Sequence, residues 1–562
     1  MKVLLINPSP MPYAEQEAFL NKTSVLRVPT FSMPLGYLDL VGFVRQEVDC
    51  DFEIIDLGAD LYEVYLSREN REPYNIESFL YDKLNQVSVT PNIVGLSLLF
   101  ASSHSSSIRL ANMAKELWPN CKVLFGGNHA TNIYQSLLDE KNIDFVVRGE
   151  AELALLEFIL KLKKGINQPD IQGVFDQSRA SVVGPENAQM LQDLTELPLP
   201  AFDAINLEFY RDTIGASVMW TRGCPFKCTF CATTTVHGRE LRYKSNEQCL
   251  EEIRHLIEDL KFQSIFIEDD LFAPKKKQFL KLSEEIAKIK GNCKFEIPQG
   301  LSVAVMDEDR IDAMLNMGIS QGAVAIESGS QFVQKNIMKK NVNLEKARNI
   351  LSYMRKSGFN AHTNFILGSP HETDQMRQES IEYMKTLDVN WIYIFHALPL
   401  PGSEMFSMFE SVADMRSVDW DSVRLGLRKF DTDNIKALDL SNLVYDTNIQ
   451  VNFFHNGNFR HGRYKLALKF WKEFILEPYP YHVVGRYCSA LAWLKMGNKD
   501  QSQQELFKCI DWIQSNDESK KLYQRYANQM PLLVKLINTK KSKPFPLKQV
   551  KTLSGGRIIP EI

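Results

Sequence analysis

The sequence contains no apolar run that approaches the roughly 20 residues of a membrane-spanning helix. Its first residues, MKVLLINPSP, carry one lysine, a short apolar stretch and two prolines. A signal peptide needs a longer apolar region and a small-residue cleavage site, so we interpret this segment as a first β-strand. We therefore expect a cytoplasmic protein without a membrane span.

The sequence also lacks a basic excess, because 65 Lys and Arg stand against 69 Asp and Glu, a net charge of −4. Proteins that coat nucleic acid normally carry a strong positive excess, so we do not expect a nucleic-acid partner beyond a small local site. The nine cysteines are an odd number, and three of them fall between residues 224 and 231. That distribution favours a metal or redox centre in a reduced compartment over a disulfide scaffold.

A length of 562 residues predicts three or four folded units. Over residues 1–180, helix-like segments alternate with short apolar runs at 3–6, 52–56, 93–97, 122–127 and 145–149. This alternation predicts an α/β fold with a doubly wound parallel sheet. In such sheets ligands bind beyond the carboxyl ends of the strands, and small and polar residues gather at those ends here.

Residues 181–215 are expected to form a linker, because the sequence LPLP at 197–200 breaks any helix. A second alternation of strands and helices covers residues 216–420. Its expected strands are 216–220, 264–267, 293–297, 322–326, 361–366 and 391–396. Six strands at this spacing predict a partial (β/α)6 barrel rather than a closed eight-stranded one.

Residues 421–562 are expected to be mostly helical. Gly462 and Gly497 lie 35 positions apart, and each opens a helical pattern with a small residue, Ala467 or Ser502, at the matching offset. The pattern fits either two tetratricopeptide-like helix pairs or an ordinary helical cap. The basic tail from Lys540 is expected to be solvated and partly mobile.

The strongest chemical signal is the segment TRGCPFKCTFC at 221–231. Three thiols spaced Cys-x3-Cys-x2-Cys after a strand can converge, and thiolates favour iron–sulfur clusters or zinc. A closed zinc site needs four protein ligands, and the nearest spare candidates are His237 and Cys249. Three ligands leave one iron of a 4Fe–4S cluster open for a substrate or cofactor. The predicted cluster ligands are Cys224, Cys228 and Cys231.

This motif resembles the cluster motif of the radical S-adenosylmethionine (SAM) superfamily. The segments FIEDD at 266–270, PQGL at 298–301, AIESGS at 325–330 and FILGSP at 365–370 resemble the later strand ends of its barrel. The resemblance implies a bound 4Fe–4S cluster and SAM. The residues that it implies for SAM binding are Phe230, Asp269, Gln299, Glu327, Ser328 and Ile366.

The segment LPLPGS at 398–403 and several amino-terminal segments resemble the cobalamin-binding branch of that superfamily. The resemblance implies a Rossmann- or flavodoxin-like cobalamin domain. The implied cobalamin contacts are Asn7, Pro8, Ser97, Ser102, Ser103, Gly126, Gly127, His129, Arg148, Gly149 and Glu150. The sequence departs from many cobalamin domains because it has no Asp-x-His-x-x-Gly segment to supply an imidazole ligand for cobalt, and we interpret His104 as a partly buried structural histidine.

The resemblance implies a methyltransferase that moves a methyl group from SAM, by way of methylcobalamin, to an unactivated carbon or phosphorus of a small metabolite. An external electron donor such as flavodoxin or ferredoxin is implied as a partner. Two alternatives stay open: a cyclisation, rearrangement or oxidation without methyl transfer, and a non-catalytic cobalamin-binding module. Tyr393, His396 and Glu404 are candidate substrate-facing groups, whereas Lys339 and Lys340 are expected on a solvated face.

Overall fold

The computed structural model describes residues 1–23, 32–67, 73–415, 418–423, 428–538, 550–552 and 558–560. The amino-terminal part contains a sheet of six strands in the order β2-β1-β3-β4-β5-β6. The first five are parallel and β6 is antiparallel. Their bounds are β1 Lys2–Asn7, β2 Asp51–Asp56, β3 Ile93–Ser97, β4 Lys122–Gly126, β5 Phe145–Val147 and β6 Val174–Phe175. The doubly wound sheet predicted from the sequence is confirmed.

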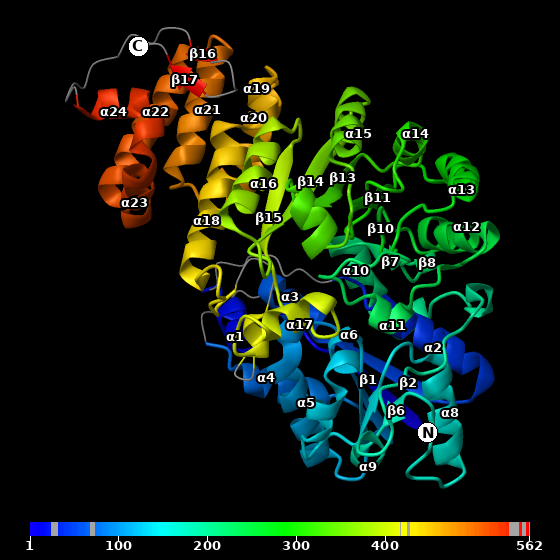
Figure 1. Ribbon diagram of the computed structural model, residues 1–562. Coiled ribbons are helices and arrows are strands. Elements are labelled where there is room, and N and C mark those ends of the chain that lie inside the picture. Colours follow the sequence, from blue (N-terminus) through cyan, green and yellow to red (C-terminus); the bar gives the residue numbers. More distant parts are fainter. Residues whose placement is uncertain are drawn as a thin grey trace.

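Helices cover both faces of this sheet because successive strand residues point to opposite sides (Figure 1). Val3 and Leu5 belong to a core formed with α2 (Leu35–Glu47) and α8 (Glu152–Lys163), whereas Leu4 and Ile6 belong to a core on the opposite face. The helices of that second face are α3 Leu57–Ser67, α4 Ile76–Asn85 and α5 His104–Leu117. Shorter helices of this region are α1 Tyr13–Leu20, α6 Asn128–Asn132, α7 Tyr134–Leu138 and α9 Gln177–Ala180.

The central part forms two arcs of parallel strands, β11-β10-β7 and β12-β13-β14-β15. Their bounds are β7 Ala216–Val218, β10 Ser264–Ile267, β11 Lys294–Glu296, β12 Leu301–Ser302, β13 Gln321–Glu327, β14 Asn360–Leu367 and β15 Trp391–His396. All six expected strands are present, and β12 is an addition. The arcs separate between β11 and β12, where Pro298 has no N–H to donate and Gly300 has a φ of +88°.

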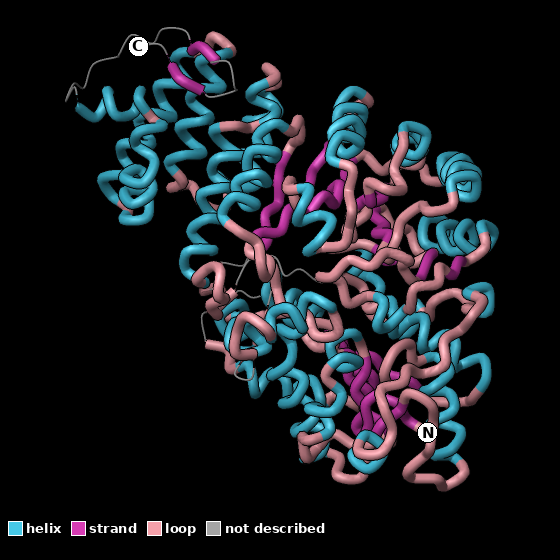
Figure 2. The backbone as a smooth tube through the Cα atoms, viewed as in Figure 1, coloured by secondary structure: helices cyan, strands magenta, loops and turns pink. Residues whose placement is uncertain are grey.

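Amphipathic helices pack on the outside of these strands (Figure 2). They are α12 Asn246–Arg254, α13 Lys276–Ile289, α14 Glu308–Asn316, α15 Leu344–Lys356 and α16 Asp374–Thr386. Side chains of Ser245, Asp307, Asn343 and Thr373 accept backbone hydrogen bonds at the starts of α12, α14, α15 and α16. Smaller elements of the barrel region are β8 Thr221–Arg222, β9 Arg242–Tyr243, α11 Thr234–His237 and α17 Glu404–Glu410.

The segment expected as a linker contains two short 3-10 helices, Leu194–Glu196 and Phe202–Ala204, and the α-helix α10 (Leu207–Thr213). The carboxy-terminal part is helical and lies beside β15, away from the amino-terminal sheet (Figure 1). Its elements are α18 Ala437–Ile449, α19 Gly457–Arg460, α20 Tyr464–Trp471, α21 Val483–Lys495, α22 Lys499–Ser515, α23 Asp517–Tyr526, α24 Pro531–Asn538, β16 Val550–Thr552 and β17 Ile558–Pro560. Among the described helices, none is both long enough and apolar enough to cross a bilayer.

The 35-residue spacing separates two similar units, and each begins with a turn at a glycine that is followed by a helix. Gly462 and Gly497 both have positive φ, +75° and +82°, and they precede α20 and α22. Ala467 and Ser502, at the matching offsets, are both fully buried. A relation to tetratricopeptide repeats stays a prediction. The basic tail at 540–549 lies outside the described residues.

A buried ion cluster joins the first sheet to the barrel. The Arg222 guanidinium on β8 lies 2.9 Å from Asp39 Oδ2 on α2 and 2.7 Å from Glu152 Oε1 on α8. It also lies 3.3 Å from Glu150 Oε2, and Arg242 on β9 binds the same Glu150 carboxylate. All these side chains are at most 7% exposed. The cations lower the pKa of Glu150 although burial acts in the opposite direction.

We expect Arg222→Met to lower the free energy of unfolding by about 3–5 kcal/mol, because it leaves three carboxylates buried without their shared cation. Thermal or urea unfolding followed by circular dichroism measures this. The matched control is Arg211→Met, because Arg211 pairs only with its exposed neighbour Asp212 and its loss should cost about 0–1 kcal/mol. Equal effects of the two changes would contradict a joining role for Arg222.

Candidate active site

The cysteine loop lies between β8 and α11. Gly223 opens it with a φ of +91°, and a Cβ there would meet Glu240 O at 2.2 Å, so only glycine fits. Thr229, inside the loop, donates from its N–H to Met338 O at 2.9 Å and from its hydroxyl to Ile337 O at 2.8 Å. These bonds fix the loop against the segment that follows β13.

The three thiols form a partly exposed donor set. Burial, with charge repulsion from Cys231 and Cys224, raises the pKa of Cys228 to about 11, and this repulsion places the three sulfurs in one neighbourhood. Metals bind the thiolate, so loading a cluster would release these protons. Within the described ranges no group of three or more His, Cys, Asp or Glu side chains converges tightly enough for a single metal ion.

The two spare candidates for a fourth ligand are engaged elsewhere. His237 Nδ1 lies 2.7 Å from Glu150 Oε1, and Cys249 is buried in the core beneath α12. The donor set is therefore three soft thiols on one loop. This set fits a 4Fe–4S cube, in which each thiolate binds a different iron and one iron keeps an open position.

Two adjacent carboxylates hold the backbone that leads into the loop. Asp269 Oδ1 accepts from Trp220 N at 2.7 Å and Thr221 N at 3.0 Å, and Asp270 Oδ2 accepts from Gly223 N at 2.8 Å. Burial raises the pKa of Asp269 to about 7, against the lowering effect of these bonds. The placement favours a structural role for Asp269 over the SAM contact expected from the sequence.

Glu268, which was not among the predicted site residues, lies on the other face of the same segment. Ile265, Ile267 and Asp269 are buried, whereas Glu268 is partly exposed and accepts from Gln299 Nε2 at 2.8 Å. Burial raises its pKa. The period of two in a strand is the signal that separates Glu268 from Asp269.

Of the remaining predicted SAM residues, Phe230 lies in the cysteine loop, and Glu327, Ser328 and Ile366 lie at the ends of β13 and β14. Phe230 and Ile366 pack against the same apolar cluster. Glu327 has a φ of +74° at a register shift between β13 and β14, and its Oε1 lies 2.9 Å from Lys340 Nζ. Ser328 is fully buried and bonds to Ser380 Oγ at 2.9 Å, so it braces the strand end.

The predicted cobalamin residues after β3 and β4 lie at the carboxyl edge of the first sheet. A Cβ on Gly126 would meet nothing within 4 Å, whereas Gly127 has a φ of +99° and its Cβ would meet Leu98 O at 2.8 Å. Open space beside a close backbone turn fits a bulky planar group. Ser97 ends β3, and the hydroxyls of Ser102 and Ser103 donate to Pro10 O and Phe100 O.

His129 is 4% exposed, and its Nε2 has no hydrogen-bond partner among the described residues. Burial lowers its pKa to about 3. Its ring lies 5.6 Å from the His104 ring and 5.3 Å from the Trp420 ring. His104 is partly buried, as expected from the sequence.

The other predicted cobalamin residues have partners within the protein. Asn7 Nδ2 donates to Asp56 Oδ1 at 3.1 Å, and Arg148 Nε donates to Thr131 O at 3.0 Å. Pro8 is buried, a Cβ on Gly149 would meet Asn187, and Glu150 belongs to the ion cluster. These placements favour support of the sheet edge over direct contact with a ligand.

The sheet edge and the cysteine loop are joined through two short helices, since α6 at the sheet edge lies beside α11, which follows the loop (Figure 1). Asn132 Nδ2 donates to Thr235 Oγ1 at 2.9 Å, and Asn187 Nδ2 donates to Thr235 O at 2.6 Å. Thr235 follows Cys231 by four residues. The predicted cobalamin edge of the sheet and the region of the predicted cluster loop therefore lie at the same interface.

Two family models match the two halves of this interface. The model "B12 binding domain" matches residues 51–159, and the model "Radical SAM superfamily" matches residues 218–384. The chain belongs to the cobalamin-binding radical SAM enzymes. The resemblance recognised in the sequence is confirmed, and with it the expected cofactors, a 4Fe–4S cluster, SAM and cobalamin.

Known relatives agree with this family. The chain is 27% identical over 450 residues to cytidylyl-2-hydroxyethylphosphonate methyltransferase of Streptomyces wedmorensis, covering 72% of this chain and 80% of the relative. It is 23% identical over 331 residues to the anaerobic magnesium-protoporphyrin IX monomethyl ester cyclase of Rubrivivax gelatinosus, covering 57% and 58%. The solved structure of the cobalamin-dependent S-adenosylmethionine radical enzyme OxsB, at 15% identity, matches with a TM-score of 0.65 over 96% of this chain and 80% of that one.

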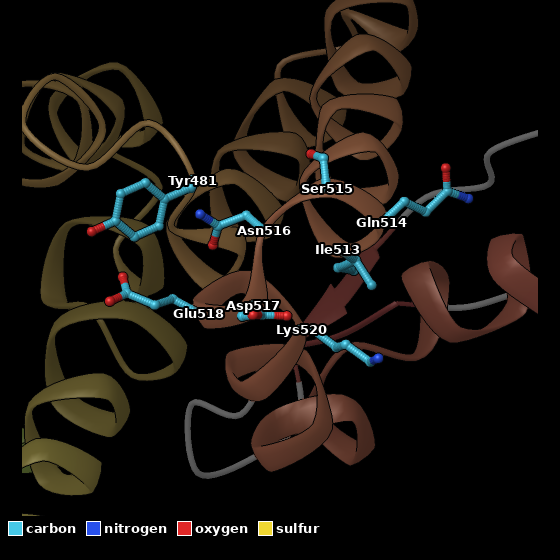
Figure 3. Close-up of a pocket in the computed structure, with 8 residues that line it drawn as sticks. All are labelled: Tyr481, Ile513, Gln514, Ser515, Asn516, Asp517, Glu518 and Lys520. Carbon is cyan, nitrogen blue, oxygen red and sulfur yellow. The ribbon is translucent and has the colours of Figure 1, made fainter.

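In this radical SAM enzyme the three candidate substrate-facing groups lie in different surroundings. Tyr393 lies 5.8 Å from the His362 ring, His396 is buried, and Glu404 pairs with Lys339 at the surface. A surface hollow lies instead at the turn between α22 and α23 (Figure 3). It is lined by Tyr481, Ile513, Gln514, Ser515, Asn516, Asp517, Glu518 and Lys520, none of which is a predicted site residue.

We expect Asp269→Ala to reduce the iron and sulfide that the protein retains after anaerobic reconstitution. The change leaves the N–H groups of Trp220 and Thr221 unsatisfied at a cost of about 1–3 kcal/mol each, and the loop that carries Cys224 loses its anchor. Asp269→Asn is the matched control, because an amide oxygen can still accept both bonds. Iron loss in both variants alike would indicate that the negative charge matters instead of the anchoring.

Proposed function

We propose that this enzyme transfers a methyl group from SAM, by way of cobalamin, to an unactivated carbon or phosphorus of a small metabolite. The observation that carries the proposal is the contact between α11, which directly follows the three-thiol loop, and α6 at the carboxyl edge of the B12-binding sheet. A radical centre and a methyl carrier need to act on one substrate, and this arrangement brings their binding edges together. The methyltransferase among the relatives supports methyl transfer as the outcome.

The protein's part in this chemistry is to bind, orient and enclose. When bound, the 4Fe–4S cluster, SAM and cobalamin supply radical formation and methyl carriage. Cys224, Cys228 and Cys231 would hold the cluster. Glu268 with Gln299 and the Phe230–Ile366 surface would orient SAM, since Glu268 lies on the face of its strand opposite the buried residues and Phe230 belongs to the cysteine loop.

The loops after β3 and β4 would receive the corrin. Gly126 and Gly127 leave room beside the backbone, and Ser102 and Ser103 form the neighbouring turn. His129 lies at this edge, and its Nε2 has no partner in the part of the chain that the structure describes. Because burial keeps the imidazole neutral, this nitrogen is available as a donor or an acceptor toward a bound group.

A second outcome, cyclisation or rearrangement without methyl transfer, is favoured by the cyclase among the relatives. The same residues would hold the same cofactors in that case. We propose further that a one-electron donor such as flavodoxin or ferredoxin reduces the cluster, and that the enzyme works in the cytoplasm on a small-molecule substrate.

The test uses anaerobically reconstituted, cobalamin-loaded protein with reductant and SAM carrying a deuterated methyl group, incubated with an extract of the source cell. We expect a deuterium-labelled product, S-adenosylhomocysteine and 5′-deoxyadenosine to appear together in mass spectrometry. Cys228→Ala should abolish all three, because the cluster loses one of its ligands.

The products separate the alternatives. 5′-Deoxyadenosine without S-adenosylhomocysteine or label transfer would contradict methyl transfer and favour the cyclase-type outcome. Activity that survives in Cys228→Ala would contradict radical chemistry altogether and leave a cobalamin-binding module.

A further inference from the structure

Lys340 lies beside the cysteine loop, in contrast to the solvated face expected from the sequence. Its side chain is 13% exposed, whereas the side chain of its neighbour Lys339 is 46% exposed and pairs with Glu404 at the surface. Two consecutive lysines therefore occupy opposite environments. A nearly buried ammonium is costly unless it has a partner or a task.

The Lys340 ammonium lies among groups of the candidate cluster and SAM site. Its Nζ is 2.9 Å from Glu327 Oε1 and 5.6 Å from the centre of the Phe230 ring. Phe230 separates Cys228 from Cys231 on the loop, together with Thr229. The ammonium therefore lies beside an aromatic ring of the cysteine loop itself.

The backbone turn that carries Lys340 is tied to both sides of the site. The Gln334 amide nitrogen donates to Ile326 O at 2.6 Å and Ser328 O at 2.7 Å, on either side of Glu327. Lys340 N donates to Gln334 O at 3.1 Å, and Met338 O accepts from Thr229 in the cysteine loop. One segment thus connects the glutamate, the lysine and the loop.

The same turn holds two residues in a costly conformation. Lys339 and Asn341, on either side of Lys340, have φ values of +49° and +52°. Non-glycine residues in this region cost energy and persist only where their surroundings enforce them. The flanking conformation directs the two adjacent lysines to opposite environments.

We propose that Lys340 is a positioning residue that fixes a positive charge beside the loop that holds the iron–sulfur cluster and so raises the cluster's reduction potential. The inference rests on the proposed assignment of a cluster to the three cysteines. Reduction adds an electron to the cluster, so a nearby ammonium stabilises the reduced form more than the oxidised form. Glu327 holds the ammonium in place and offsets some of its charge.

The test is a redox titration of the full-length protein, reconstituted with iron and sulfide in the absence of SAM and monitored by electron paramagnetic resonance. We expect Lys340→Met to move the midpoint potential to a more negative value, and Lys340→Arg to stay near the wild type because it keeps the charge. Lys339→Met is the matched control. It removes the same charge from the adjacent, exposed side chain, where water and salt screen it, and should leave the potential unchanged.

An unchanged potential in Lys340→Met with a full complement of iron would overturn the inference, as would equal shifts in Lys340→Met and Lys339→Met. If Lys340→Met does not load a cluster, Glu327→Gln gives the decision. Removing this carboxylate leaves the ammonium uncompensated and should move the potential to a less negative value, and a shift of the other sign or none contradicts the inference. A wild-type protein that binds no cluster would overturn the proposed function as well, which distinguishes that failure from failure of the role of Lys340.

Discussion

The buried guanidinium of Arg222 is the interaction on which the arrangement of this protein depends. It lies on the short strand immediately before the cysteine loop and binds carboxylates from α2 and from the segment that follows β5. The same two parts also share apolar packing, since Leu38 of α2 and Ala59 of α3 belong to the core of the barrel. Because these charges are buried, removing the guanidinium while the interface stays closed leaves the carboxylates unpaired and away from water, which is costly.

Acidic residues near the site divide into those that hold the backbone and those that face the barrel. Asp269 and Asp270 accept backbone N–H groups between residues 220 and 223, so they shape the approach to the first cysteine. Glu268 and Glu327 instead bind side chains. The Glu268 carboxylate accepts a hydrogen bond from Gln299, and the Glu327 carboxylate accepts one from Lys340. The chemistry of the site is therefore built on a rigid frame, and the same residue type serves both purposes.

Sequence alone predicts the parts of the fold that depend on local pattern. The apolar runs locate every main strand within a few residues, and the cysteine spacing locates the loop. The two-residue strands β6, β8, β9 and β12 are missed, because so few residues carry no periodic signal. The family resemblance implies Asp269 as a SAM contact, although strand alternation places Glu268, and not Asp269, on the face opposite the buried residues. Glu150 and Lys340 could not be placed, because their partners lie 72 and 13 positions away, across turns that no local pattern specifies.

The most direct test of the account is Mössbauer spectroscopy of the anaerobic protein reconstituted with iron-57, before and after addition of SAM. The account predicts a 4Fe–4S cluster in which one iron changes its spectrum when SAM binds, while the three cysteine-bound irons do not. Zinc at the loop, an absence of bound iron, or a cluster whose four irons ignore SAM would contradict it.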